Sequence, residues 1–238
     1  MVDIESLRSR LEAVRAEIAG ACARSGRSLS TVRLVGVTKT LPAEVVQAAL
    51  DLGLEDFGEN YIQELTSKAA ALPPVRWHFI GHLQRNKAAA AAQYASFVHS
   101  LDSLELIKTL DRRLGMVGRT CSGLIQVHLG GEESKSGLEI PEVLPLLDAL
   151  AQEPVRNLRL VGLMSVPPPV QHPDDNRPYF RQLRALLQQI TERGYDFWQG
   201  QELSMGMSDD YAVAIEEGAT MVRVGRSIFG ARPPKAAH

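Results

Sequence analysis

The residue with the clearest chemical potential is a lysine at the end of a short apolar run. Lys39 directly follows the run at 32–37, within the stretch GVTKT (36–40). At the end of a strand, a lysine can point its amine into a pocket, where burial and neighbouring cations lower its pKa. Such an amine attacks carbonyl groups. Lys39 is therefore a candidate Schiff-base lysine, although an isolated loop lysine is more often an ordinary surface residue.

Two short motifs near the end of the chain combine glycine with hydroxyl and cationic side chains. SMGMSD (204–209) leads from an apolar run into a helical pattern, and RVGRS (223–227) leads from the next run into a short turn. Ser208 is expected at a helix N-terminus, where free backbone N–H groups attract an anion. Gly225 lets a ligand approach the backbone closely. Each motif is common alone, but together they predict a two-loop phosphate site.

Asn60 and His82 follow the second and third apolar runs. Asn60 suits a helix N-cap as well as a ligand contact, so both roles stay open. His78 is expected within a strand, packed and hydrogen-bonded in the core, whereas His82 is expected where that strand ends. We predict no metal site, because neither histidine has a second ligand-type side chain at metal-like spacing.

A repeated alternation of short apolar runs and helical patterns must position these residues. It comprises eight units in series without a linker. Such a series predicts an α/β fold, a single (β/α)8 TIM barrel over residues 1–238, with an open doubly wound sheet as the alternative. In such barrels the site lies at the C-terminal ends of the strands, and the loops after the seventh and eighth strands bind phosphate. The predicted strands are 32–37, 56–58, 76–80, 97–100, 123–129, 158–164, 202–205 and 221–224, and the predicted helices are 42–52, 61–71, 85–92, 104–114, 141–151, 176–193 and 209–217, with a turn from Ser227.

The first 26 residues predict one extra helix ahead of the barrel. Apolar residues recur there at spacings of three and four, and Gly26 suits the end of the helix. We expect this helix to pack on the barrel, with a partner-binding or coiled-coil helix as the alternative. The apolar positions are Ile4, Leu7, Leu11, Val14 and Ile18.

Composition excludes several classes of protein. The net charge is −2, which argues against a nucleic-acid binder because such proteins need a clustered basic surface. The two cysteines, Cys22 and Cys121, form no disulfide framework. The N-terminal stretch carries too many charges for a signal peptide, and no apolar run is long enough to span a bilayer. We therefore predict a cytoplasmic globular protein.

Several motifs, taken together and in order, closely resemble the pyridoxal 5'-phosphate (PLP) homeostasis protein family, also called the proline-synthase co-transcribed type. The resemblance covers the chain from about Glu5 to Gly230. The family is similar in fold to the barrel domain of alanine racemase. The segments that carry the resemblance are VTK (37–39), FGENY (57–61), WHFIGHLQ (77–84), LMS (163–165), SMGMS (204–208) and RVGRSIFG (223–230).

The resemblance implies a cofactor and the residues that bind it. Lys39 would hold PLP covalently as an aldimine, and Arg223 would face the pyridine nitrogen. The phosphate would be bound by Ser208, Gly225 and Arg226, and the ring would be lined by Asn60 and Met164. The stretch KSGL (135–138) also matches the family, with no role assigned to Lys135. His82 is left out of the binding set because relatives differ there.

The resemblance also bears on activity. A permanent cation at Arg223 disfavours protonation of the pyridine nitrogen, so the ring withdraws electrons less strongly. Racemases of this fold add a tyrosine base from a second domain, whereas only residues 231–238 follow the last predicted turn here. We therefore predict a monomeric PLP carrier that supplies apo PLP-enzymes and has no catalytic residue. A fold-type III racemase and a cofactor-free class I aldolase with Lys39 as nucleophile are the alternatives.

Overall fold

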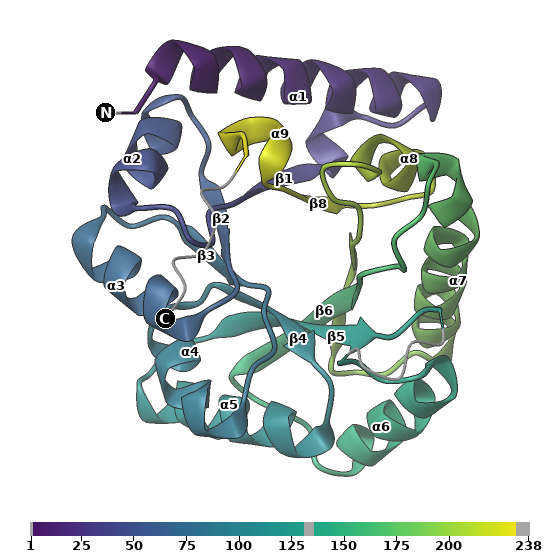
Figure 1. Ribbon diagram of the computed structural model, residues 1–238. Helices are drawn as coiled ribbons and strands as arrows, with labels where there is room; N and C mark the ends of the chain where they lie inside the picture. The colour runs from purple at the N-terminus through teal and green to yellow at the C-terminus, as the bar shows by residue number, and fades with distance from the viewer. Residues whose placement is uncertain (1, 131–135, 232–238) are drawn as a thin grey trace.

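Eight parallel strands close into a barrel in the computed structural model, which describes residues 2–130 and 136–231 (Figure 1). The strands follow one another in chain order around the barrel, and β8 closes it against β1, where Val35 lies in register with Arg223. The predicted α/β barrel is confirmed, and the open sheet is excluded. The strands are β1 (Arg33–Val37), β2 (Asp56–Glu59), β3 (Arg76–Phe79), β4 (Phe97–Leu101), β5 (Cys121–Val127), β6 (Leu158–Ser165), β7 (Trp198–Ser204) and β8 (Met221–Val224).

Helices surround the barrel, and an apolar layer lies between them and the strands (Figure 1). The helices that follow the strands begin and end close to the predicted bounds. They are α2 (Ala43–Asp51), α3 (Ile62–Ala71), α4 (Ala88–Tyr94), α5 (Leu104–Met116), α6 (Ile140–Gln152), α7 (Arg177–Arg193), α8 (Tyr211–Glu216) and α9 (Arg226–Phe229), with 3-10 turns η1 (Leu29–Thr31), η2 (Arg85–Lys87) and η3 (Pro173–Asn176).

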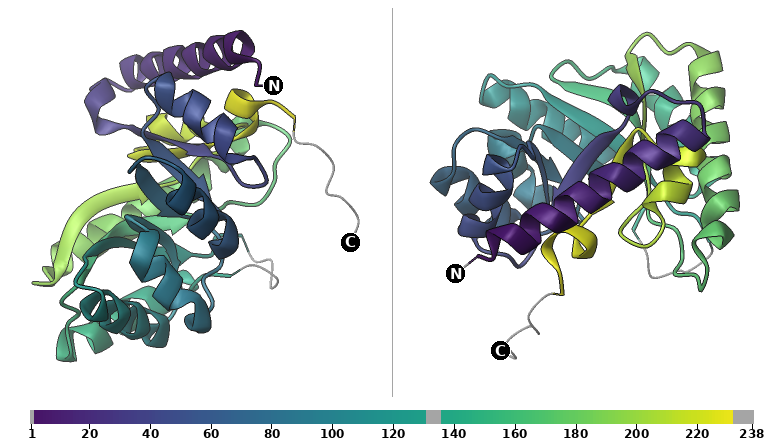
Figure 2. Two further views of the ribbon diagram at one scale, coloured as in Figure 1. Left: turned by 90° about the vertical axis from the view of Figure 1, so that its left-hand side faces the viewer. Right: turned by 90° about the horizontal axis from the view of Figure 1, so that it is seen from above.

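The extra helix α1 (Ile4–Arg24) lies along α8 and α9 on one side of the barrel (Figures 1 and 2). Its predicted apolar stripe is buried except at Ile4, which is 50% exposed. Side chains from this region also reach the barrel units: Arg10 Nε donates to Ile228 O at 2.7 Å, and Arg27 donates to Ala219 O at 2.8 Å. The helix ends at Arg24 with Ser25 as its C-cap, and the φ of 65° at Gly26, the next residue, confirms the predicted stop.

Four predicted elements start two or more residues away from their predicted positions. β5 begins at Cys121 and not at 123, and α4 begins at Ala88 and not at 85, because the 3-10 turn η2 occupies the first three predicted positions. β7 begins at Trp198 and not at 202, because its first half alternates between exposed and half-buried positions and so gives no continuous apolar signal. α8 begins at Tyr211 and not at 209, with Asp210 at the N-cap position. The Asp210 carboxylate accepts a 2.6 Å hydrogen bond from Met207 N, which holds the turn that precedes the helix. The prediction that Ser208 stands at the helix N-terminus is therefore wrong; it lies two residues earlier, in a turn.

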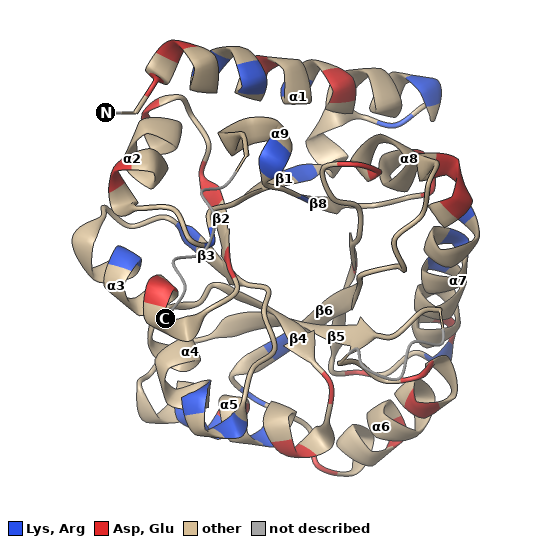
Figure 3. Cartoon of the chain, in the orientation of Figure 1, with Lys and Arg blue, Asp and Glu red and all other residues tan. Residues whose placement is uncertain are grey.

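Acidic and basic residues are interspersed along the outer helices, including α1 and α7 (Figure 3). This mixture accords with the near-neutral net charge of the chain. Among the described residues, no helix combines the length and the apolar character needed to span a bilayer.

Candidate ligand site at the barrel mouth

Lys39 follows β1 at the C-terminal mouth of the barrel, where it is half-buried. The residues on either side of it are held firmly. The Thr38 hydroxyl donates to Glu59 Oε1 at 2.6 Å, and the Thr40 amide donates to Glu64 Oε2 at 2.6 Å. Thr40 has a φ of 66°, which a β-branched residue rarely adopts. The backbone that carries Lys39 is therefore fixed at both flanks.

A buried ion pair lies directly behind this segment. Lys68 Nζ donates to Glu59 Oε1 at 2.7 Å and to the Thr38 carbonyl at 2.8 Å. Burial raises the pKa of Glu59 to about 7, although the hydrogen bonds from Lys68 and Thr38 oppose this rise. We infer that the pair supports the first loop of the site. Sequence reasoning missed it, because Glu59 and Lys68 are common types whose partnership depends on how α3 packs on β2.

The two C-terminal motifs come together as predicted. The Ser208 hydroxyl lies 3.3 Å from the Gly225 amide and 3.4 Å from the Ser227 amide. Both hydrogen bonds are long, and an anion that shared these donors would replace weak contacts with charge-assisted ones. The Arg226 side chain is exposed and pairs with Asp209, so its contribution to an anion site would come from its backbone.

The Ser208 hydroxyl and the amides of Gly225 and Ser227 are called the phosphate cradle below. Arg223 lies on β8, just before the loop that carries these amides, with 4% of its surface exposed. Its guanidinium donates to the Ser204 carbonyl at 2.7 Å, the Ser204 hydroxyl at 2.6 Å and the Ser165 carbonyl at 2.8 Å. Burial lowers the pKa of Arg223 to about 10, with Asp210 opposing the shift. The arginine remains a cation at neutral pH, and its hydrogen bonds are to neutral oxygens.

The other predicted ligand residues flank the same mouth. Met164 is buried near the end of β6 and lines a pocket with Ile80 and His128. Asn60 is half-buried after β2, and its backbone packs closely against Gly81. The structure thus places residues from the ends of β2, β6 and β8 around one opening.

His82 and Lys135 were left out of the predicted binding set. His82 is 53% exposed, and its Nδ1 lies 3.5 Å from an Asp102 carboxylate oxygen. Lys135 lies outside the described residues. No group of histidine, cysteine and acidic side chains within 2–130 and 136–231 is arranged to hold a metal ion.

The barrel interior holds polar residues whose hydrogen-bond partners sequence reasoning did not identify. His78 is buried and hydrogen-bonded in the core, as predicted, but its partners are Asp56 and His99. The hydroxyl of Ser165 is also buried, and no described residue gives it a partner. An unsatisfied hydroxyl beside Arg223 suits a polar ligand group. The sequence did contain one indication that these residues face the interior: they lie on predicted strands, where every second side chain points into the barrel.

The contribution of the Asp56 carboxylate to the free energy of unfolding is expected to be fully present above about pH 4 and to decrease at lower pH. Burial raises its pKa, but hydrogen bonds from His78 and Arg76 outweigh burial and lower the pKa to about 2, from an ordinary 3.8. The stabilisation is therefore lost as pH falls from about 4 through 2, and it amounts to about 2 kcal/mol at about 1.4 kcal/mol per pKa unit.

Urea unfolding at pH 7 and at pH 3 checks this expectation. Asp56→Asn should lose about 2 kcal/mol at pH 7 and show a flatter pH dependence than the wild type. The control Glu55→Gln removes an exposed partner of Arg76 and should cost less than about 1 kcal/mol. Equal losses in the two variants would contradict the role given to Asp56.

Comparison with known proteins defines first the class of barrel. The family described as "Alanine racemase, N-terminal domain" matches residues 9–233. Alanine racemase from Clostridium difficile 630 has the same fold, with a TM-score of 0.71 at 14% identity over 97% of this chain and 61% of that chain. The barrel is therefore of the alanine racemase N-terminal class.

Closer relatives define the family. A pyridoxal phosphate homeostasis protein from Aquifex aeolicus is 41% identical over 94% of this chain and 97% of its own. One from Pseudomonas aeruginosa is 42% identical over 96% and 97%. PipY from Synechococcus elongatus PCC7942, solved with PLP bound, has a TM-score of 0.83 at 32% identity over 94% of this chain and 100% of that chain. The chain belongs to the pyridoxal phosphate homeostasis protein family, as the sequence motifs predicted.

Proposed function

We propose that this protein binds PLP at the C-terminal mouth of the barrel, with Lys39 holding it as a Schiff base. The observation that carries the proposal is the convergence of the Ser208 hydroxyl with the amides of Gly225 and Ser227, in the loop that directly follows the strand of buried Arg223. The relatives support it, since two carry the name of the cofactor and a third was solved with PLP bound.

The donor set fits the parts of PLP. Ser208 and the backbone at Gly225 and Arg226 would bind the phosphate. Arg223 would face the pyridine nitrogen, while Asn60 and Met164 would line the ring. When bound, PLP supplies an aldehyde that exchanges between amines and a ring that withdraws electrons.

The role that best suits this site is to store PLP and deliver it without turnover. Arg223 would place a cation against the ring nitrogen, which would disfavour protonation there and limit activation of a bound amino acid. The proposed recipients are apo PLP-enzymes, and the proposed state is a monomer. The test of binding is an absorbance spectrum of the purified protein before and after borohydride, which should fix PLP to Lys39. A colourless protein that PLP does not titrate would refute the proposal and favour cofactor-free lysine chemistry.

The second candidate function is a racemase, favoured by the shared barrel class. We expect no racemisation at the rates of ordinary enzymes, about 1–10³ s⁻¹. The holoprotein would be incubated with L- and D-amino acids in D2O, with Cα deuteration followed by NMR and stereochemistry by chiral chromatography. Interconversion of any enantiomeric pair at such a rate would replace the carrier proposal with the racemase.

Ser208→Ala should weaken PLP binding by about 1.5–3 kcal/mol, the value typical of a hydrogen bond to a charged group. The reason is that the hydroxyl, which lies beside the amides of Gly225 and Ser227, would contact only the phosphate part of the proposed ligand. Pyridoxal, which lacks the phosphate, serves as the control ligand in the same fluorescence titration. If PLP and pyridoxal lost equal affinity, Ser208 would be acting on the ring or the fold.

A further inference from the structure

A row of buried polar side chains crosses the barrel interior and ends at Arg223. Asp56 Oδ1 lies 2.9 Å from His78 Nε2, and His78 Nδ1 lies 2.9 Å from His99 Nε2. His99 Nδ1 lies 2.9 Å from the Ser204 hydroxyl, which is 2.6 Å from the Arg223 guanidinium. The two histidines and the serine are fully buried, and the five residues come from β2, β3, β4, β7 and β8.

The chemistry of the two ends gives this row one direction. Arg223 can only donate, so Ser204 Oγ accepts a hydrogen bond from it. The Ser204 hydroxyl in turn donates a hydrogen bond to His99 Nδ1. The Asp56 carboxylate can only accept, so His78 donates through Nε2. His99 must then donate through Nε2 to His78 Nδ1. Both histidines are thereby assigned the neutral Nε2–H tautomer.

The surroundings of the histidines agree with neutral rings. Burial lowers the pKa of His99 well below its ordinary value, and the neighbouring His78 and Arg223 lower it further. Burial also lowers the pKa of His78, although Asp56 opposes the shift. A protonated His99 would donate from both nitrogens and leave the Ser204 hydroxyl proton without its acceptor in the row.

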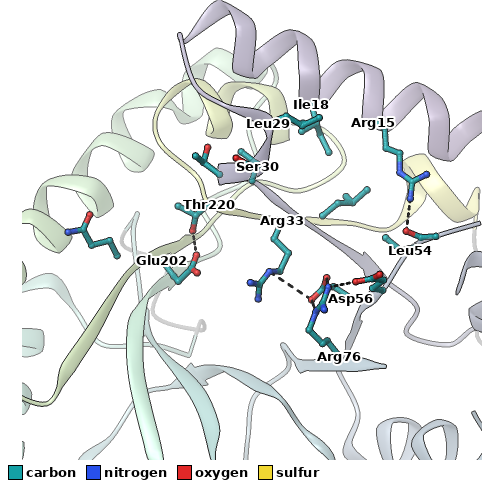
Figure 4. A pocket seen from close by; sticks show the side chains of 16 residues that line it. Arg15, Ile18, Leu29, Ser30, Arg33, Leu54, Asp56, Arg76, Glu202 and Thr220 are labelled. Carbon is teal, nitrogen blue, oxygen red and sulfur yellow. Dashed lines mark hydrogen bonds and ion pairs between the residues drawn. The ribbon is translucent and has the colours of Figure 1, made fainter. Parts of the chain in front are cut away.

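The far end of the row lies at the opposite mouth of the barrel, in the pocket of Figure 4. There Arg76 donates twice to Asp56, at 2.9 Å each. Arg33 Nε lies 4.0 Å from Asp56, and its guanidinium stacks 4.9 Å above the Phe97 ring. Asp56 is therefore held as a carboxylate, and its charge is fixed at one end of the row.

We propose that Ser204, His99 and His78 are positioning residues that lock Arg223 in place and relay to it the negative charge of Asp56. Every acceptor in the row points its lone pair towards Arg223, so the hydrogen-bond dipoles are aligned. This alignment offsets the desolvation free energy of a buried cation whose direct partners are neutral oxygens. The consequence for the ligand rests on the proposed function, because Arg223 is the group assigned to the pyridine nitrogen.

The direction of the row can be tested without any ligand. Nitrogen-15 NMR of histidine side chains in the apo-protein at pH 7 should show His78 and His99 protonated at Nε2 alone, with slowly exchanging ring protons. An Nδ1–H tautomer or a cationic ring at either position would overturn the proposal. This measurement holds whether or not the protein binds PLP.

The effect on the site is tested by a pair of variants at one position. His99→Leu breaks both bonds, whereas His99→Gln offers one donor and one acceptor. His99→Leu should weaken PLP binding about 10-fold, in line with a lost hydrogen bond to a charged group, and should make the absorbance of bound PLP depend on pH near neutrality. His99→Gln should restore most of the affinity and a pH-independent spectrum. The exposed His172→Leu is the control and should match the wild type.

The outcomes separate the two proposals. If the wild type does not bind PLP, the proposed function fails while the NMR result still decides the direction of the row. If the wild type binds PLP and both His99 variants share its affinity and spectrum, the row has no role at Arg223 and this inference is wrong. If His99→Leu does not fold, Asp56→Asn replaces it, because an asparagine oxygen keeps the bond from His78 while the charge is removed.

Discussion

Lys39→Ala is expected to abolish the Schiff-base absorbance of the protein while leaving its fold intact. The lysine is half-buried at the barrel mouth and is not part of the apolar layer, so its removal leaves packing unchanged. The phosphate cradle and Arg223 stay in place, so weaker, non-covalent binding should persist. The measurements are the absorbance spectrum with added PLP and the mass of the protein after borohydride.

Thermal unfolding separates loss of the covalent link from loss of the fold. Without PLP, the variant should melt close to the wild type. With PLP, the wild type gains stability by mass action, about 2.7 kcal/mol at a ligand concentration of 100 Kd, and the variant gains less. Lys108→Ala, on the outer helix α5, is the matched control and should keep the absorbance band. A band retained by Lys39→Ala would move the Schiff base to another lysine.

The barrel was predictable because most of its strands are buried on both faces. Strands such as β1 and β8 read as short β-branched and apolar runs, and each is followed by a helical pattern. β7 was placed too late, because Trp198–Gln201 extends into solvent and its residues are only partly buried. The start of α8 was misplaced because serine and aspartate suit an N-cap equally well, and residue types alone do not show that Asp210 takes this position.

The candidate site was predictable only in part. The loops after the last two strands of a barrel must be neighbours, so the meeting of Ser208 with Gly225 follows from topology. The contact between His78 and His99 does not, because it depends on the register of β3 against β4, and a slip of one residue would turn either ring outward. Pairs formed by helix packing, such as Glu59 with Lys68, are equally invisible in sequence.

Gly81→Ala is expected to be among the most damaging single substitutions near the site. A Cβ at this position would lie 2.0 Å from the Asn60 carbonyl oxygen and 2.8 Å from the Asn60 carbonyl carbon. The obstacle is backbone, which cannot rotate away like a side chain, and the neighbouring bond from the Ile80 amide to Glu59 O at 2.9 Å holds the two segments together. We expect a loss of about 3 kcal/mol, at the upper end of ordinary overpacking.

The loss should extend to binding, because the segment pushed aside carries Asn60, which is proposed to line the ring. Urea unfolding and a PLP titration of the same sample measure both effects. Gly20→Ala is the control: it lies within α1, where an added Cβ meets only the flexible Arg24 guanidinium at 3.3 Å. Alanine is the better helix former, so this variant should gain up to about 1 kcal/mol and bind PLP normally. If Gly81→Ala were as stable as Gly20→Ala, the close approach of β3's end to Asn60 would be absent in solution, and Asn60 would have to be positioned by other contacts.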